Sequence, residues 1–493
     1  MDKVFKINPK DNVVVALEDV KQGETFTVDG AQVTAKQDIT RGHKMAIRPI
    51  ADGECVVKYG NPIGTANGRI EAGDWVHIQN VKTRLGDLLE YTYEPGFHDL
   101  PKVEQKTFQG YVRKDGKVGI RNEVWIIPTV GCVNAIAKAI EDASQKFLTP
   151  EIDGIFSYSH PYGCSQMGED HINTQKALCG LIHHPNAGAV LVVALGCENN
   201  TMEQMKERLG EYDPDRVKFI VCQEHEDEIA DGVELVGELC KYAAQFKRET
   251  CPASMLTVGL KCGGSDGLSG ITANPLVGAF SDLLVARGGT TILTEVPEMF
   301  GAETILMNRC KDKKTFQKTV DLINNFKQYF MDHHQEIDSN PSPGNKAGGI
   351  TTLEDKSLGC IQKGGSATVN DVLTYGQPVK EKGLNLLQAP GNDLVASLAL
   401  AVSGAHMVLF TTGRGTPFGC PVPTVKISSN TPLSVRKADW IDFNAGCLVE
   451  GTPMEELSEK FFDYLMEVAS GKHTKSENFD KRDLAIFKDG VTL

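Results

Sequence analysis

The sequence has no long apolar run, no cluster of basic residues and no closely spaced cysteine pair. No segment approaches the roughly 20 apolar residues of a membrane-spanning helix, and the first residues lack the apolar stretch of a signal peptide. The 65 acidic and 51 basic residues give a net charge of −14, which disfavours nucleic acid and anionic membranes as partners. We therefore expect a cytoplasmic protein that binds a small molecule.

The thirteen cysteines include no C-x-x-C pair, which disfavours a zinc ribbon or a thioredoxin-type site. In a reducing compartment such thiols are packed, catalytic or metal-binding. Glycine lets the backbone reverse, so cysteines that directly follow a glycine are expected at chain turns. Those cysteines are Cys132, Cys164, Cys197, Cys360, Cys420 and Cys447.

Length and pattern predict a multidomain chain, because 493 residues exceed one core. Residues 1–83 alternate short β-rich runs with turns and predict a small all-β module. Residues 84–109 show no strong period and are interpreted as a linker. Afterwards apolar runs are repeatedly followed by a loop and an amphipathic stretch, the pattern of α/β domains with mainly parallel sheets. We divide this part into domains over 110–250 and 251–493.

Reactive side chains fall in the loops that follow the predicted strands. In open α/β sheets ligands bind at the carboxyl ends of strands, where a helix N-terminus also favours a thiolate. One cysteine or acid in such a loop is most often a packing residue or a helix cap, so the cluster carries the prediction. The residues are Cys132, Cys197, Cys262, Glu295, Glu298, Asn392, Asp393, Arg414 and Cys420.

Residues 156–171, FSYSHPYGCSQMGEDH, combine histidines, a cysteine and carboxylates with glycines and a proline that interrupt regular structure. We interpret them as an active-site loop in which His160 or Cys164 contacts a metal or the substrate; a purely structural loop is the alternative. The histidine pair at 183–184 is expected to be exposed and is given no role.

Two glycine-rich stretches, TTGRGTPFG and KCGGSDGLSG, fit neither a dinucleotide fingerprint nor a P-loop. Arg414 in the first stretch suits a carboxylate, which arginine grips through paired hydrogen bonds. Lys346 lies in PSPGNKAGG, which is interpreted as a flexible loop that either contacts the substrate or is a plain surface loop.

Seven stretches spread over the chain resemble the altronate dehydratase/galactarate dehydratase family of sugar-acid dehydratases. The N-terminal one is similar to the β-clip module, called the SAF domain, that precedes the α/β body in this family. They read GHKMAIRPIADGECVVKYGNPIGTA, GYVRKDGKVGIRNEVWIIPTVGCVN, SHPYGCSQMGEDH, GLKCGGSDGLSGITANPLVG, TEVPEMFGAE, SPGNKAGGITTLEDKSLGCIQKGG and TTGRGTPFGCPVPT.

The resemblance implies a hydro-lyase that converts a sugar acid to its 2-keto-3-deoxy product with loss of water, supported by Fe(2+) or Mn(2+). Chain length favours conversion of D-altronate to 2-dehydro-3-deoxy-D-gluconate, with galactarate dehydration as the alternative. A sulfolactate sulfo-lyase, usually split into two subunits, fits the fused chain less well. Two further readings stay open: a dehydratase with an iron–sulfur cluster on three cysteines from separate loops, and a non-catalytic sugar-acid-binding protein. The sequence leaves a homo-oligomer open.

Dehydration beside a carboxylate requires cations or a metal against the developing dianion, a base for the C2 proton and an acid for the C3 hydroxyl. The sequence offers candidates for each role without assigning them. The candidates for proton transfer are His43, His160, His171 and Lys58; for substrate binding Lys44, Tyr59, Arg414, Lys346, Asn392 and Asp393; and for metal ligation Cys164, Cys197, Cys262, Glu295 and Glu298.

The β module carries the pairs His43–Lys44 and Lys58–Tyr59 at predicted turns. A module of this size is too small to form a deep pocket, and ligand sites commonly form where domains meet. We therefore expect the module to fold over the α/β crevice and share its site, with 84–109 as a tether that permits opening.

Overall fold

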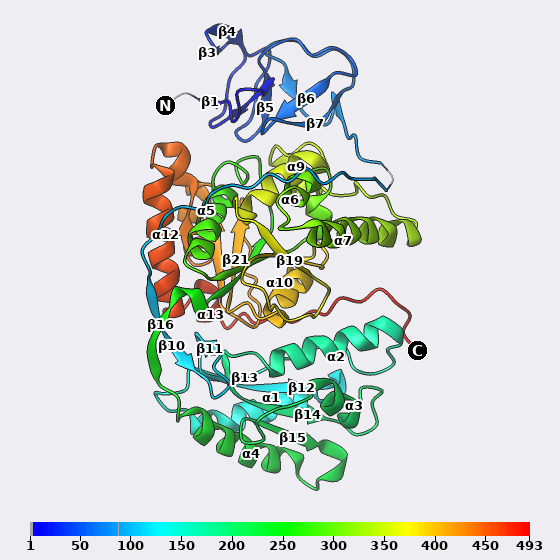
Figure 1. Ribbon diagram of the computed structural model, residues 1–493, viewed down its shortest axis with the longest axis vertical. Coiled ribbons are helices and arrows are strands. Elements are labelled where there is room, and N and C mark those ends of the chain that lie inside the picture. Colours follow the sequence, from blue (N-terminus) through cyan, green and yellow to red (C-terminus); the bar gives the residue numbers. More distant parts are fainter. Residues whose placement is uncertain (1–2, 87) are drawn as a thin grey trace.

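The computed structural model describes residues 3–86 and 88–493. Figure 1 shows the β module at one end, the α/β domain that follows it in sequence at the other end, and the C-terminal α/β domain between them. The predicted fold class is confirmed, because the module has antiparallel sheets and the largest sheet of each α/β domain is parallel.

The N-terminal module consists of short strands joined by tight turns. Two of its hairpins turn on residue pairs with positive φ, Asp29–Gly30 and Tyr59–Gly60, as a type I′ turn requires. The sheets have the orders β1-β2-β5-β8, β6-β7-β9 and β3-β4. The strands are β1 (Val4–Phe5), β2 (Val13–Ala16), β3 (Thr25–Val28), β4 (Ala31–Thr34), β5 (Lys44–Ala46), β6 (Cys55–Lys58), β7 (Asn61–Ala66), β8 (Trp75–Val76) and β9 (Val81–Lys82).

The second domain is built on a parallel sheet of order β13-β12-β14-β15. Its central strands are buried along their whole length, as expected when helices cover both faces. A small antiparallel sheet, β11-β10-β16, pairs the strand that enters the domain with the strand that leaves it. The strands are β10 (Thr107–Val112), β11 (Val118–Gly119), β12 (Glu123–Pro128), β13 (Gly154–Ser157), β14 (Ala187–Ala194), β15 (Val217–Val221) and β16 (Arg248–Pro252).

Helices α1 (Asn134–Ser144) and α4 (Glu228–Ala243) pack together beneath this sheet, and α2 (Gly168–Ile182) packs against the C-terminal domain. A shorter helix, α3 (Met202–Leu209), contacts α2. The expected loop at 156–171 is wrong for its first two residues, which end β13, and for its last four, which begin α2 at Gly168. Glu169 and Asp170 occupy the first turn of α2 and favour its N-terminus.

The C-terminal domain has a seven-stranded parallel sheet of order β19-β20-β18-β17-β21-β22-β23. The chain leaves β17 toward β18 on one side and later returns to β21 on the other, so β17 stands at the topological switch point, where ligands bind in such sheets. The strands are β17 (Thr257–Cys262), β18 (Thr290–Leu293), β19 (Val369–Leu373), β20 (Gly383–Leu387), β21 (Met407–Thr412), β22 (Thr424–Ser428) and β23 (Phe443–Asn444).

Nine α-helices accompany this sheet among the described residues. All of them except the short α8 pack against the sheet or against a neighbouring helix or 3-10 turn of the chain. They are α5 (Ala273–Ala286), α6 (Glu303–Met307), α7 (Lys313–Asp332), α8 (Pro343–Ala347), α9 (Leu353–Cys360), α10 (Asp393–Val402), α11 (Thr431–Arg436), α12 (Met454–Ala469) and α13 (Lys475–Asn478).

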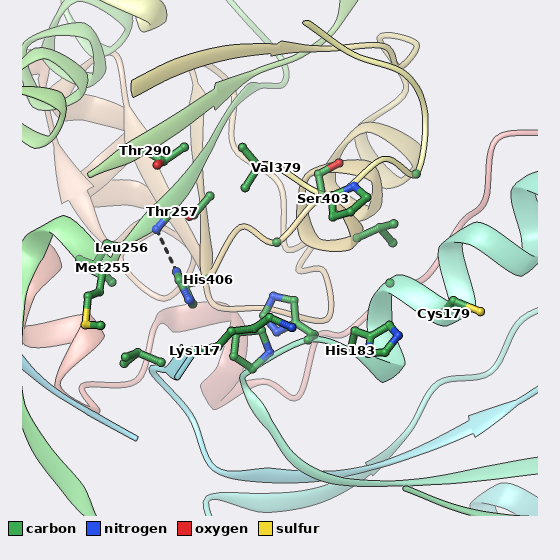
Figure 2. Close-up of a pocket in the computed structure, with 18 of the residues that line it drawn as sticks. Lys117, Cys179, His183, Met255, Leu256, Thr257, Thr290, Val379, Ser403 and His406 are labelled. Atoms are coloured by element: carbon green, nitrogen blue, oxygen red, sulfur yellow. Dashed lines mark hydrogen bonds between the residues drawn. The ribbon is translucent and has the colours of Figure 1, made fainter. Parts of the chain in front are cut away.

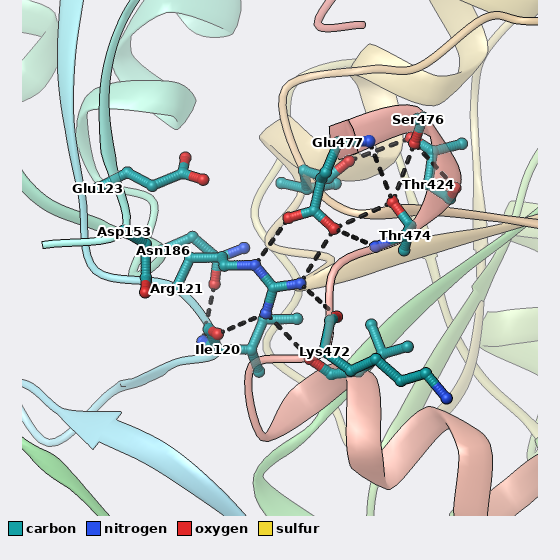
Figure 3. Close-up of polar contacts among 12 residues, drawn as sticks. Ile120, Arg121, Glu123, Asp153, Asn186, Thr424, Lys472, Thr474, Ser476 and Glu477 are labelled. Carbon is teal, nitrogen blue, oxygen red and sulfur yellow. Dashed lines mark hydrogen bonds and ion pairs between the residues drawn. The ribbon is translucent and has the colours of Figure 1, made fainter. Parts of the chain in front are cut away.

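A buried arginine joins the two α/β domains. The guanidinium of Arg121 contacts the Glu477 carboxylate at 2.7 Å and donates to the carbonyls of Val468 and Lys472 (Figure 3). Burial opposes ionisation, yet Arg121 lowers the pKa of Glu477 to about 2. Hydrophobic side chains from both domains, such as Leu178 of α2, pack in one shared cluster.

The predicted linker runs along the C-terminal domain. Among its described residues no helix or strand forms between β9 and β10. Its tyrosine hydroxyls donate hydrogen bonds to that domain, Tyr91 to Glu303 and Tyr93 to the carbonyl of Cys310, both at 2.6 Å. The linker is therefore fastened to the domain beneath the module.

Candidate active site

The β module is held to the C-terminal domain by one carboxylate between two lysines. Lys44 in β5 and Lys58 in β6 are buried, and their ammonium groups lie 2.8 Å and 2.9 Å from the two oxygens of Asp355 in α9. Burial alone would raise the pKa of Asp355, but the two lysines outweigh burial and hold this pKa well below its usual range. Burial lowers the pKa of Lys44 to about 8. The site therefore carries excess positive charge out of water.

The contact between the module and the domain is close because glycines meet there. A Cβ on Gly267 would lie 1.9 Å from the carbonyl oxygen of Gly42, and one on Gly349 would lie 2.3 Å from the same atom. The Gly349 carbonyl in turn accepts a hydrogen bond of 2.8 Å from Lys44. Any side chain at these positions would push the module away from the site.

Two histidines of the module face the same domain. Nδ1 of His43 accepts a hydrogen bond from the Trp75 indole at 3.1 Å, and Nε2 lies 3.3 Å from the carbonyl of Ala347. His77 lies 3.0 Å from the Thr351 hydroxyl. Burial lowers the pKa of both histidines, that of His77 to about 4, so both are neutral at neutral pH.

Two thiols and a carboxylate lie beneath the lysines. Cys262 ends β17, Cys360 ends α9, and their sulfur atoms are 3.5 Å apart. Oε2 of Glu298 lies 2.9 Å from the Cys262 sulfur. A hydrogen bond from the Cys360 thiol outweighs burial and lowers the pKa of Cys262 to about 6. The Cys262 thiol, which donates to the Glu298 carboxylate, therefore loses its proton more readily than a free thiol.

Three further buried lysines, Lys261, Lys356 and Lys363, surround this cluster. Lys356 lies 2.6 Å from Glu298, and despite burial it keeps the pKa of that carboxyl below its usual range. Lys261 contacts Glu295 and lies 2.8 Å from Asp393. Burial and the Cys262 charge raise the pKa of Glu295 well above its usual range. Glu295 also has a left-handed backbone, φ 71°, a strained conformation that is typical of functional sites.

A small cavity lies between Lys58 of the module and the Cys360 thiol. Its volume is about 10 Å3, enough for about one water molecule. Lys58 and Tyr59 of the module line it together with Asp355, Lys356 and Cys360 of α9. A sugar acid is far larger than one water, so the module or its facing loops must move to admit it.

The donor atoms of Cys262, Glu298 and Cys360 could hold a metal ion. All three side chains are buried and their ligand atoms lie within 4.8 Å of one another. A carboxylate beside a thiol of lowered pKa favours a cation, and a site with two sulfurs suits Fe(2+) better than Mn(2+), which prefers oxygen donors. Three protein ligands leave a position free for substrate, as in catalytic metal sites. The residues therefore fit the expected ferrous ion.

The structure brings many of the sequence-predicted residues to this boundary. Arg414 and Lys346 lie at its edge, where Arg414 donates to the carbonyl of Gly344 at 3.1 Å, beside α8. Asn392 caps α10 through the N–H groups of residues 394 and 395. The predicted residues inside the site are His43, Lys44, Lys58, Tyr59, Cys262, Glu295, Glu298 and Asp393.

Four predicted residues lie in the second domain, at the far end of the molecule from the module (Figure 1). His160 is buried and its ring bonds the Pro128 carbonyl at 2.7 Å, which is a structural contact. His171 contacts Gln204 from the surface of α2. Cys164 and Cys197 are exposed, and neither belongs to the group of clustered ligand atoms around Cys262.

The sequence analysis did not assign to the site the residues of α9 and of the 3-10 turn at Ile361–Gly364 that follows it. Asp355, Lys356, Cys360 and Lys363 occur in successive turns of LEDKSLGCIQKGG, and charged residues at such spacing on a buried helix were the available signal. Lys261 was overlooked because it lies inside an apolar strand.

A second, much larger cavity lies between the two α/β domains (Figure 2). Its volume is about 580 Å3, and His183, Thr257, Ser403 and His406 are among its lining residues. It contains none of the carboxylates and thiol pairs of the site above. The expectation that the 183–184 pair is exposed is wrong for His184, which is 2 % exposed and bonds the Ala405 carbonyl at 3.1 Å.

An N-terminal β module closed over the switch point of a parallel sheet, with buried lysines and paired thiols, defines a multidomain α/β enzyme. Three domain families match the chain in order: the altronate/galactarate dehydratase SAF domain at residues 2–84, the D-galactarate dehydratase/altronate hydrolase second domain at 110–244, and the D-galactarate/altronate dehydratase C-terminal domain at 253–492.

Full-length relatives agree with these matches. The chain is 56% identical to altronate dehydratase of Escherichia coli K12 over 99% of both chains, and 54% identical to that of Bacillus subtilis 168 over 100% of both. It is 34% identical to galactarate dehydratase (L-threo-forming) of Escherichia coli K12, over 95% of this chain and 93% of the relative. The chain belongs to the altronate/galactarate dehydratase family, whose members are hydro-lyases. None of the helices formed by residues 3–86 and 88–493 has the length and apolarity to cross a membrane.

Proposed function

We propose that the protein dehydrates D-altronate to 2-dehydro-3-deoxy-D-gluconate. The observation that carries the proposal is the difference in identity over essentially full length, 56% and 54% to two altronate dehydratases against 34% to a galactarate dehydratase. The buried cations support the reaction class, because removing a proton beside a carboxylate builds a second negative charge that must be neutralised.

Binding of the substrate carboxylate is assigned to the lysines at the module boundary. Lys58 keeps its charge, because Asp355 outweighs the effect of burial and raises its pKa. Lys58 and Lys356 reach the same cavity from opposite domains. An anion between these two lysines would contact both of them only when the module is closed. The closed module also excludes water during proton transfer.

Lys44 is assigned as the base for the C2 proton. Its pKa of about 8 makes a neutral amine accessible near neutral pH, as general bases require. Tyr59 keeps its proton, since burial raises its pKa to about 12, and its hydroxyl is suited to protonate the departing C3 oxygen. His43 presents an N–H to the facing loop and is assigned to closure of the module.

A ferrous ion held by Cys262, Cys360 and Glu298 would supply Lewis-acid polarisation of a substrate oxygen. The residues around it hold the carboxylates in place: Lys356 binds Glu298, and Lys261 binds Glu295. Asp393 extends the same network toward α10.

The test is a panel of aldonates and aldarates, assayed without oxygen and with ferrous ion, that scores formation of 2-keto acid. We expect D-altronate to be turned over at least tenfold faster than galactarate. Faster turnover of galactarate would reassign the substrate within the family, and absence of keto acid from every sugar acid would favour a binding protein.

A further inference from the structure

The exposed cysteines are concentrated at one edge of the second-domain sheet. Of the thirteen cysteines, only Cys132, Cys164 and Cys197 are exposed. Cys132 follows β12 in a 3-10 turn at Gly131–Val133, Cys164 follows β13, and Cys197 follows β14. These three strands are parallel neighbours in the order β13-β12-β14, so their carboxyl ends share one edge. Three exposed thiols therefore lie in three separate loops along this edge.

Hydrogen bonds fasten the three loops to one another. The N–H of Gly131 donates to the Tyr162 carbonyl at 2.9 Å, which joins the first loop to the second. The N–H of Asn200 donates to the Gly163 carbonyl at 3.1 Å, which joins the third loop to the second. The Asn200 side chain also donates to the Thr129 carbonyl at 3.1 Å. Each thiol thus lies one to three residues from a fixed inter-loop contact.

A buried carboxylate and a glycine fix the loops further. Glu198 accepts hydrogen bonds from the Thr129 hydroxyl at 2.7 Å and from the Gly196 N–H at 2.6 Å, beside Cys197. A Cβ on Gly163 would lie 2.0 Å from the Thr129 carbonyl oxygen, so only glycine permits this approach beside Cys164. These contacts fix the three loops relative to one another. A surface loop that only connects two elements does not require such contacts.

The spacing of the thiols argues against ligation of one ion. Among the described residues, the only group of three or more donor atoms within 4.8 Å of one another is the Cys262 cluster, so these three sulfurs are spread more widely. The Cys197 sulfur accepts from Gln223 at 3.5 Å and the Cys164 sulfur lies 3.8 Å from Asn199. A four-iron cluster binds each thiolate at a different corner and requires such spread donors.

We propose that Cys132, Cys164 and Cys197 bind a [4Fe–4S] cluster, with one thiolate on each of three irons and the fourth iron open to an oxygen or nitrogen ligand. Each thiol releases its proton when it ligates iron, and no electron is transferred in binding. This site is separate from the proposed ferrous site at Cys262. It offers a second Lewis-acidic metal, at the other end of the molecule from the β module.

The test is anaerobic reconstitution of the full chain with ferrous ion and sulfide, followed by iron and acid-labile sulfide analysis, visible absorption and electron paramagnetic resonance after reduction. We expect about four sulfides per chain in the wild type. Cys132→Ser, Cys164→Ser and Cys197→Ser should each lose most of the sulfide and the visible band while unfolding at the same urea concentration as the wild type.

Two controls separate this proposal from the proposed function. Cys447→Ser removes a thiol that also follows a glycine but lies in the C-terminal domain, and it should keep the full sulfide content. Cys262→Ser should keep the sulfide while losing ferrous iron. A wild type without acid-labile sulfide, or three serine variants that retain it, would overturn the cluster, whatever the dehydratase assay gives.

Discussion

The indole N–H of Trp75 donates to Nδ1 of His43 at 3.1 Å. An indole nitrogen only donates, so Nδ1 carries no proton and His43 is the neutral tautomer with its proton on Nε2. That proton points to the Ala347 carbonyl across the module boundary, 3.3 Å away. In this arrangement His43 offers no free lone pair to a substrate proton.

His43→Gln should therefore keep most of the activity, because its amide nitrogen can replace Nε2 as the donor to Ala347. We expect kcat/KM within about threefold of wild type for His43→Gln and about tenfold lower for His43→Ala, the scale of one net hydrogen bond. A proton-transfer role for His43 requires a different result, a loss of about 10²-fold or more in both variants. Steady-state kinetics on D-altronate separates these outcomes.

The shared carboxylate Asp355 should be essential for stability. In Asp355→Asn the charges of Lys44 and Lys58 stay buried without a counter-charge, and breaking a buried pair costs about 3–5 kcal/mol. We expect a loss of this size in the free energy of unfolding, measured with urea. Asp38→Asn, in the exposed pair with Lys21 of the same module, is the matched control and should leave the unfolding curve unchanged. Equal curves for both variants would show that the module boundary does not contribute.

Lys44→Arg tests the assignment of the base. Arginine keeps the positive charge beside Asp355 but does not release its proton, so kcat should fall by about 10²–10⁴-fold with little change in KM. Lys58→Arg changes the other partner of the same carboxylate and should lose about tenfold at most. In the wild type, kcat should rise with pH through about 8, since the neutral amine is the active form. An unchanged kcat in Lys44→Arg would assign the base elsewhere.

Cys262→Ser and Glu298→Gln should each lower the iron content by about one ion per chain without changing the sulfide content. Each substitution deletes one of the three proposed ligands of the ferrous ion. Activity should fall in parallel, and chelation of the wild type should reproduce the loss. Cys310→Ser is the control, since this buried thiol bonds Thr319 and lies outside the cluster. Iron content equal to wild type in both ligand variants would contradict the proposed ferrous site.

The cluster of Cys262, Glu298 and Cys360 shows which site residues can be predicted from the sequence and which cannot. Cys262 and Glu295 were predicted because each follows a strand, and parallel strands bring their carboxyl ends to one edge. Cys360 was noted only as a cysteine after glycine, since it ends a helix whose position depends on packing against the module. Cys164 also follows a strand, and the predicted division at residue 250 places it in another domain than Cys262, but the pattern does not reveal whether the loops of the two domains meet. One expected metal site therefore became two separate groups of thiols.

The interface between the two α/β domains should weaken in mild acid. His184 and His406 face each other with ring centroids 6.3 Å apart. Both ring nitrogens of His184 and Nδ1 of His406 make hydrogen bonds to backbone groups. Burial lowers the pKa of His184 to about 3 and that of His406 to about 4, from an ordinary 6.5. The other charged groups near His184, Arg216 and Lys117, are cations and oppose its protonation further.

Because both folded-state pKa values are depressed, this stability is present above about pH 6.5 and is lost as the pH falls toward about 4. Between these values the unfolded chain binds about two more protons, so the free energy of unfolding should fall by about 1.4 kcal/mol per pH unit for each histidine. Urea unfolding at about pH 7 and about pH 5 measures the slope. His406→Gln should remove roughly half of this contribution, and His98→Gln, on the exposed linker, should remove none. A slope that is the same in wild type and His406→Gln would show that other groups control the acid response.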